Sequence, residues 1–244
     1  MPVSLRRHLV TKKVADASGN KVRVVKFGGA KGAVLAGRML RIESRAARVK
    51  SYSSTVARAV AGARAAQRAF RNGGKVSLRK ELSLNNALLD EKIYVEILES
   101  KKYAGDEAKM VADWIKGDNL GGSVVPAKPL FESIIRRRLG LGLAAEAGKA
   151  GFGRKAIPIK GVLLDSLTHS ALVEPVVERL TRGLPNHFEV TKLVDENKGI
   201  MMHFPQSTNG KYHAVLTYEG KLMGDVTKNF RECMLPSLRK YLDA

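Results

Sequence analysis

Residues 33–50 read AVLAGRMLRIESRAARVK, and two stripes of side chains run through this stretch. Apolar residues recur there at helical spacing, at Leu35, Met39, Ile42, Ala46 and Val49. A second stripe, made of arginine, steps by three, four and three residues, at Arg38, Arg41, Arg45 and Arg48. Both spacings keep side chains on one face of an α-helix. The stretch therefore predicts a helix with an apolar face beside an arginine face.

The predicted helix covers residues 33–71. Its second half is rich in alanine, a strong helix former, and carries three further arginines on a shared face, at Arg64, Arg68 and Arg71. The run Ser51-Tyr52-Ser53-Ser54 marks a bend or an interruption, and Asn72-Gly73-Gly74 is a typical helix end.

Positive charge is concentrated in the first third of the chain. Residues 1–80 hold twenty Lys and Arg but only two acids, Asp16 and Glu43, so this third carries +18 of the net +20. Such a concentration predicts an anionic partner, either nucleic-acid phosphate or the acidic face of a large assembly. The residues expected to contact that partner are Arg6, Arg7, Lys12, Lys13, Arg38, Arg41, Arg45, Arg48, Arg64, Arg68 and Arg71.

Composition limits the remaining choices. A chain of 244 residues forms one large domain or two small ones, and 44% apolar residues suffice for a core. Aromatic residues make up only 6%, which argues against binding bases by stacking. The lone cysteine, Cys233, excludes an internal disulfide and a Cys-rich metal site, and we predict no cofactor. No apolar run is long enough to cross a membrane.

The pattern along the chain predicts an α+β fold in two parts, a basic arm with its Arg-striped helix (1–80) and a mixed α/β body (81–244). The arm begins as an extended segment or a β-hairpin over residues 1–31. Strands are predicted over 91–98, 187–194, 199–204 and 211–218, the last two joined by short hairpin turns. Helices are predicted over 103–116, 130–143, 162–171, 173–182 and 225–242.

Catalytic patterns are weak in this sequence. The stretch 142–150 has a P-loop-like look, but its glycine spacing is one residue too long and Ala150 replaces the magnesium-binding Ser or Thr. Asp165, Ser166 and His169 are close in sequence, which is no evidence for a triad, so we interpret His169 as a capping or surface residue. Cys233 reads as a core residue, and the histidines lack metal-ligand spacing. The sequence thus predicts a protein that is not an enzyme.

One stretch resembles the tail-completion, or neck, proteins of tailed bacteriophages. The resemblance covers about residues 91–140 and rests on Tyr103-Ala104, on 112–117 (ADWIKG) and on 125–131 (VPAKPLF). It implies a non-enzymatic virion component that joins head to tail as a homo-oligomeric ring. It also implies an assembly motif made of Trp114, Pro126, Ala127, Lys128, Pro129 and Phe131.

Two alternatives remain open at this point. A ribosomal protein, cytoplasmic or mitochondrial, would use the same basic arm to bind rRNA. An enzyme acting on nucleic acid would also explain the charge, although no catalytic constellation supports it.

Overall fold

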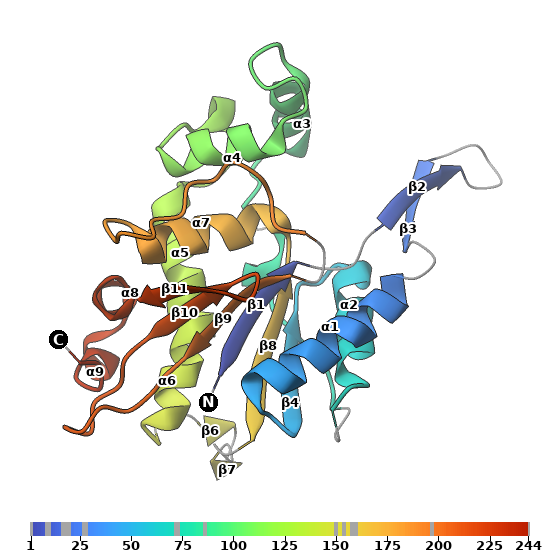
Figure 1. Cartoon of the computed structure of the whole chain (residues 1–244). Coiled ribbons are helices and arrows are strands. Elements are labelled where there is room, and N and C mark those ends of the chain that lie inside the picture. Colours follow the sequence, from blue (N-terminus) through green and yellow to red (C-terminus); the bar gives the residue numbers. More distant parts are fainter. Residues whose placement is uncertain are drawn as a thin grey trace.

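A seven-stranded mixed β-sheet forms the centre of the computed structural model (Figure 1). The structure describes residues 2–7, 11–15, 21–25, 29–70, 74–84, 87–148, 151–152, 155–156, 161–195 and 198–243. The sheet order is β11-β10-β9-β1-β8-β4-β5. Four neighbouring strands are parallel, namely β1 (Val3–Arg7), β8 (Val162–Thr168), β4 (Arg48–Ser53) and β5 (Ser77–Leu78). The rest are antiparallel, namely β9 (Gly199–His203), β10 (Val215–Tyr218) and β11 (Lys221–Asp225).

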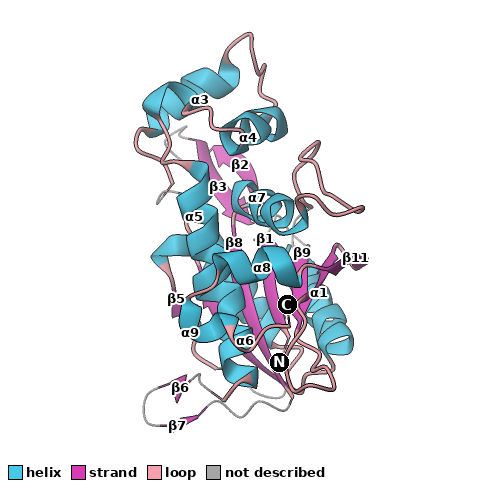
Figure 2. Cartoon of the chain, turned by 90° about the vertical axis from the view of Figure 1, so that its left-hand side faces the viewer, coloured by secondary structure: helices cyan, strands magenta, loops and turns pink. Residues whose placement is uncertain are grey.

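Helices cover both faces of this sheet (Figures 1 and 2). One face carries α1 (Gly29–Ser44) and α2 (Ala57–Gln67). The other carries α5 (Ala127–Ile134), the π-helical turn η4 (Ile135–Leu139), α6 (Gly140–Glu146), α7 (Ser170–Thr181) and α8 (Thr227–Cys233). The remaining short elements are η1 (Lys80–Leu82), α3 (Glu91–Glu99), α4 (Glu107–Ile115), η3 (Leu120–Gly122), β6 (Gly151–Phe152), β7 (Lys155–Ala156) and α9 (Pro236–Arg239). The prediction of an α+β fold is confirmed.

Residues 1–80 contribute three strands to the same sheet as the rest of the chain. β1 and β4 flank β8, which comes from the C-terminal half. The predicted N-terminal hairpin is present as β2 (Thr11–Ala15) paired with β3 (Lys21–Val25), and it projects away from the sheet (Figure 1). Its expected turn at 18–20 lies outside the described residues.

The single helix expected over 33–71 is wrong. After Ser44 the chain turns through Arg45, whose φ is 52°, and then runs as β4 before α2 begins. Ala46 and Val49 do point inward, where they pack with Leu163 of β8. The predicted apolar face of α1 is wrong, because Leu35, Met39 and Ile42 are 59%, 58% and 71% exposed, whereas α1 buries Ala33 and Leu40.

The predicted helix over 162–171 and the predicted strand over 91–98 are also wrong. Every residue of β8 is buried, as expected for a central parallel strand covered on both faces. In 91–98, the Asp90 carboxylate accepts hydrogen bonds from the backbone N–H groups of Lys92 and Ile93 and caps helix α3. Residues 187–194 form no strand, and the closing helix is divided into α8 and α9, with Pro236 at the first position of α9.

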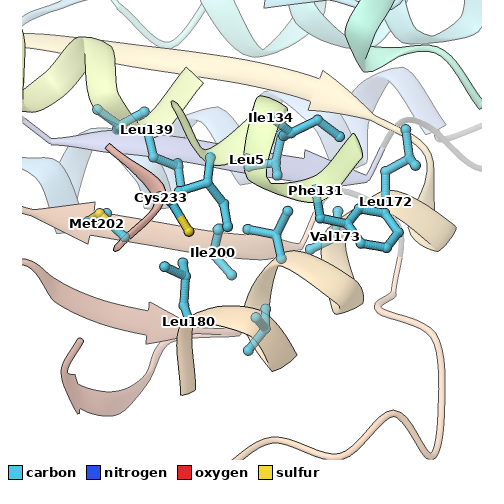
Figure 3. Close-up of a cluster of buried hydrophobic side chains, with 14 of the residues drawn as sticks. Leu5, Phe131, Ile134, Leu139, Leu172, Val173, Leu180, Ile200, Met202 and Cys233 are labelled. Carbon is cyan, nitrogen blue, oxygen red and sulfur yellow. The ribbon is translucent and has the colours of Figure 1, made fainter. Parts of the chain in front are cut away.

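The main core lies between the sheet and the helices of the α5–α8 face (Figure 3). Leu5 of β1 and Met202 of β9 meet Ile134 of α5, Leu172 of α7 and Cys233 of α8 there. Leu5, Ile134, Leu172, Met202 and Cys233 are completely buried. No helix in the described part of the chain is long and apolar enough to cross a membrane.

The opposite face of the sheet holds a buried ion pair under α1. The Arg6 guanidinium donates two hydrogen bonds to the Asp165 carboxylate, at 2.8 and 2.6 Å, and the Ser4 hydroxyl donates a third at 2.6 Å. Arg6 is 2% exposed and Asp165 1%. These bonds join β1 to β8 at the middle of the sheet and compensate the cost of burying both charges.

We expect Asp165→Ala to lower the free energy of unfolding by about 3–5 kcal/mol, because the buried Arg6 guanidinium would lose its counter-charge. Urea denaturation followed by circular dichroism measures this loss. The matched control is Asp195→Ala, which removes an exposed pair with Lys198 at 3.1 Å and should cost about 1 kcal/mol or less. Replacing both partners, as in Arg6→Met with Asp165→Leu, should cost less than Asp165→Ala alone. Equal losses in the Asp165→Ala and Asp195→Ala variants would contradict this account.

Candidate active site

The carboxyl ends of the four parallel strands meet at one edge of the sheet. Arg7, the last residue of β1, is the register partner of Thr168, the last of β8. Ser53, the last of β4, pairs with Leu167 of β8 and with Leu78 of β5. Ligands of parallel α/β sheets bind outside such an edge, where neighbouring strands send their chains to opposite faces. That condition is met between β1, which leads to α1, and β8, which leads to α7 (Figure 1).

His169 follows β8 directly and occupies the N-cap position of α7. It is 7% exposed, and its side chain makes no cap hydrogen bond. Thr168, the residue before His169, pairs with Arg7, and adjacent strands lie about 4.8 Å apart, so the backbone of His169 follows directly from the residue beside Arg7. A histidine therefore stands beside an arginine at the start of a helix. His8 follows Arg7 in the sequence and lies outside the described residues.

The end of β4 adds a second helix N-terminus to this edge. The backbone N–H of Ser54 donates to the Leu167 carbonyl at 3.0 Å, which ties the end of β4 to β8. Within the described residues, the buried Ser54 hydroxyl has no hydrogen-bond partner. α2 starts three residues later without a side-chain cap, and the half-buried Arg58 lies in its first turn. Uncapped N–H groups at a helix N-terminus favour an anion.

A basic cluster borders the edge beyond β4. The backbone N–H of Arg79 donates to the Ser53 carbonyl at 2.8 Å. The guanidinium carbons of Arg79 and Arg138 lie 5.5 and 5.0 Å from the centre of the Tyr52 ring. Arg138 comes from the π-helical turn η4, and its Nη2 lies 2.9 Å from the Glu81 carboxylate. Its buried Nε and Nη1 have no hydrogen-bond partner within the described residues, so the cluster has donors to offer.

Burial shifts the acid–base behaviour of this cluster. Burial raises the pKa of Tyr52 to about 12, despite the opposing charges of Arg138 and Arg79. Burial also lowers the pKa of Arg138, which the Glu81 carboxylate partly offsets. Burial, with help from the Arg79 charge, lowers the pKa of Lys50. Burial thus disfavours the charged forms of Arg138 and Lys50.

The connector between α7 and β9 holds Arg7 from the other side. Arg7 Nη1 donates to the Val194 carbonyl at 2.7 Å. The Val194 backbone N–H in turn donates to the carboxyl group of Glu174, a completely buried residue of α7. Burial raises the pKa of Glu174 to about 8, although Arg7 acts in the opposite direction. Glu174 is therefore protonated at neutral pH and fixes the segment that holds Arg7.

The residues expected to bind an anionic partner are dispersed. Arg7 lies at the carboxyl edge, whereas Arg6 is buried with Asp165. Those exposed on or next to α1 and α2 are Arg38, Arg41, Arg45, Arg64 and Arg68. Arg48 is half-buried in β4, Lys12 and Lys13 belong to β2, and Arg71 lies outside the described residues. The predicted set therefore divides between this edge and the α1–α2 surface.

Half of the predicted assembly motif, namely Trp114, Ala127 and Phe131, is buried in the chain's own core. Trp114 packs edge-on against Phe131, with ring centres 5.0 Å apart, and its Nε1 donates to the Val125 carbonyl at 2.8 Å. Ala127 is buried, whereas Pro126, Lys128 and Pro129 are exposed at the start of α5. This motif thus closes an internal contact between α4 and α5.

Other catalytic candidates from the sequence do not converge on one site. Asp165 faces Arg6 under α1 and is already fully engaged by hydrogen bonds. Burial raises the pKa of Cys233 to about 11, which leaves its thiol unreactive at neutral pH. Among the described residues, no group of three or more His, Cys, Asp or Glu could hold a metal ion.

Comparison with known proteins identifies the fold. No family model and no curated protein matches the chain. Among solved structures, "Mycobacterial hydrolase 1" is similar at a TM-score of 0.52 and 15% identity, over 85% of this chain and 91% of that chain. "Mycobacterial hydrolase 2" has a TM-score of 0.52 at 14% identity, over 91% of both chains. The mycobacterial glucosyl-3-phosphoglycerate phosphatase has a TM-score of 0.50 at 14% identity, over 90% of this chain and 98% of that chain.

These similarities correct the functional predictions. The fold is shared with hydrolases and a phosphatase, so the resemblance to phage neck proteins is wrong, and so is the virion ring that it implied. The ribosomal alternative and the prediction of a protein that is not an enzyme are contradicted by the same finding. The sequence analysis missed the pattern of a strand that ends in polar residues just before a helix. This pattern occurs twice, at Ser53-Ser54 between β4 and α2 and at Thr168-His169 between β8 and α7.

We expect stability to fall as the pH rises from about 4.3 towards 8, with Glu174 as one cause. An unfolded Glu loses its proton near pH 4.3, whereas folded Glu174 keeps it up to about pH 8. Between these values the folded state binds the extra proton, so its contribution to stability is lost at up to about 1.4 kcal/mol per pH unit. Glu174→Gln should flatten this decline in urea denaturation, while the exposed control Glu189→Gln should not. Parallel pH profiles for all three proteins would contradict this assignment.

Proposed function

We propose that the chain is a phosphohydrolase that removes the phosphoryl group from a phosphomonoester at the carboxyl edge of its sheet. The observation that carries the proposal is the register pair Arg7–Thr168, which sets Arg7 beside His169. The uncapped N-terminus of α2 lies at the same edge. Fold similarity to a phosphatase supports this reading.

The arginines supply the binding chemistry. A guanidinium binds two phosphate oxygens at once and keeps its charge, so Arg7 and Arg58 suit a dianionic phosphate. The basic cluster of Arg79 and Arg138 adds positive potential on the side of β4 and β5. These groups would stabilise the charge that spreads over the phosphoryl oxygens in the transition state.

Imidazole supplies the nucleophile in this proposal. A ring nitrogen attacks phosphorus, the bond from phosphorus to the ester oxygen breaks, and the leaving oxygen takes up a proton from a nearby acid. A water oxygen then attacks phosphorus, the phosphorus–nitrogen bond breaks, and inorganic phosphate and the free imidazole are released. His169 and His8 are the two candidates for the ring that carries the phosphoryl group.

Hydrolysis of p-nitrophenyl phosphate in the presence of EDTA tests this function. We expect metal-independent release of p-nitrophenol that orthovanadate inhibits, and a loss of at least about 100-fold in His169→Ala and in Arg7→Ala. The matched control is His213→Ala. His213 comes two residues before Val215 of β10, which pairs with His203 at the end of β9, so it lies towards the edge of the sheet opposite the proposed site. That variant should keep its activity.

Replacing each histidine separates their roles. His8→Ala and His169→Ala, incubated with labelled substrate and quenched in alkali, show which ring is required for an acid-labile phosphoryl-enzyme. A folded wild-type protein that releases no phosphate from any of a panel of phosphomonoesters would contradict the proposal. Full activity in His169→Ala would contradict the placement of the active site at the carboxyl edge of the parallel strands.

A further inference from the structure

The outer surface of α1 and α2 carries unusually uniform charge. Residues 29–70 contain nine Lys and Arg but only one acid, Glu43. The Glu43 carboxylate accepts a hydrogen bond from the Thr217 hydroxyl of β10 at 3.1 Å, on the side of α1 that faces the antiparallel strands. The exposed cations of the surface are Lys31, Arg38, Arg41, Arg45, Arg64 and Arg68, named here the basic surface.

Three of these cations converge on one hollow. A depression of about 300 Å³ lies between the two helices and is lined by Lys31, Val34, Leu35, Arg38 and Arg68. Cations from two separate helices thus surround a space that admits a phosphate group. The arrangement brings Arg38 together with Arg68, which lies thirty residues further along the chain, and the positive charge gathered there favours an anion.

The backbone packing of the two helices fixes this hollow in place. A Cβ atom on Gly37 would lie 2.3 Å from the Ala66 carbonyl oxygen, so only glycine allows this approach. Ala33 of α1 packs on Ala65 of α2, and Arg41 Nη1 donates to the Ala69 carbonyl at 3.0 Å. The basic surface is therefore built on a close, preformed helix pair and does not require a partner to assemble it.

The spacing of the cations suits an extended polyanion. Arg38 of α1 lines the hollow together with Arg68, and Arg45 stands at the turn that ends α1, so the cations do not form a single point of charge. Arg64 is exposed on α2, and Arg68 is exposed at its C-cap. Met39 lines a different cavity, of about 410 Å³, with Ile200 and Met201 on the other flank of α1. Leu35 lines both cavities, so apolar and basic side chains adjoin one another on the exposed face of α1.

We propose that the basic surface binds the phosphodiester backbone of nucleic acid without preference for sequence. Guanidinium groups bind phosphate oxygens in a bidentate manner, which accounts for the dominance of arginine. Among the described residues, the large exposed apolar side chains include no aromatic ring that could stack on a base, so the proposed binding depends on phosphates. This inference does not rest on the phosphohydrolase proposal.

Fluorescence anisotropy of the full chain with a labelled 20-base-pair DNA duplex, in phosphate-free buffer at several salt concentrations, tests the inference. The test variant is Arg38→Gln/Arg64→Gln/Arg68→Gln, which keeps helix propensity and spares the Arg41 bond. The matched control, Lys92→Gln/Lys101→Gln/Lys116→Gln, removes the same charge from exposed positions around α3 and α4. Circular dichroism verifies that all three proteins are folded.

We expect the test variant to bind at least about 10-fold more weakly than the wild type, with a salt slope reduced by about 2.7. The control should stay within about two-fold of the wild type, and changing the duplex sequence should not alter binding. Absence of DNA binding by the wild type would overturn the inference, as would equal losses in both variants. Stronger binding to polyglutamate or to anionic vesicles than to DNA would also overturn it.

Discussion

The buried ion pair between Arg6 and Asp165 determines how the centre of this fold is aligned. It joins β1 to β8, two strands that are separated by about 160 residues of chain and that neighbour each other only in the folded sheet. A buried charge tolerates no loss of its partner, so this pair penalises any other register of the two strands. A slip by one residue would also turn Arg6 into the apolar core on the opposite face. The pairing of Arg7 with Thr168, and with it the candidate site, depends on this alignment.

The site is then assembled from the residues that come directly after each aligned strand. β8 passes into His169 and α7, and β4 passes into Ser54 and α2. Hydrogen bonds between the strand ends, such as that from Ser54 to Leu167, hold these exits together. On the far side, Glu174 and Val194 hold Arg7 with a buried carboxyl group that is neutral at pH 7. Each functional side chain is thus placed by backbone geometry and not by its immediate neighbours in sequence.

The sequence could predict those elements whose pattern is set locally. The hairpin of β2 and β3, the strand β9 and the helix α4 were within reach because turn residues and apolar spacing define them. The class of fold followed from the same patterns. Helix α5 also lies where a proline-led helix start was expected.

The sequence could not predict the central strands or the candidate site, because both depend on pairing between segments that are distant in the chain. The apolar spacing of 162–171 fits a helix, and only pairing with β1 and β4 makes it a strand. Once β8 is taken for a helix, His169 is an ordinary residue on that helix instead of the end of a strand. The motif that contains Trp114 and Phe131 gave the opposite kind of error. Its local sequence resembles an element that contacts other subunits, but the two rings pack against each other inside this chain.

A crystal structure of the protein soaked with tungstate would test the central claim most directly, because the heavy oxyanion locates a phosphate site without assuming a substrate. The account predicts an anion at the carboxyl edge of the parallel strands, within hydrogen-bond distance of His169 and Arg7 and of the first turn of α2. Tungstate bound elsewhere on the protein, with this edge left empty, would contradict the account.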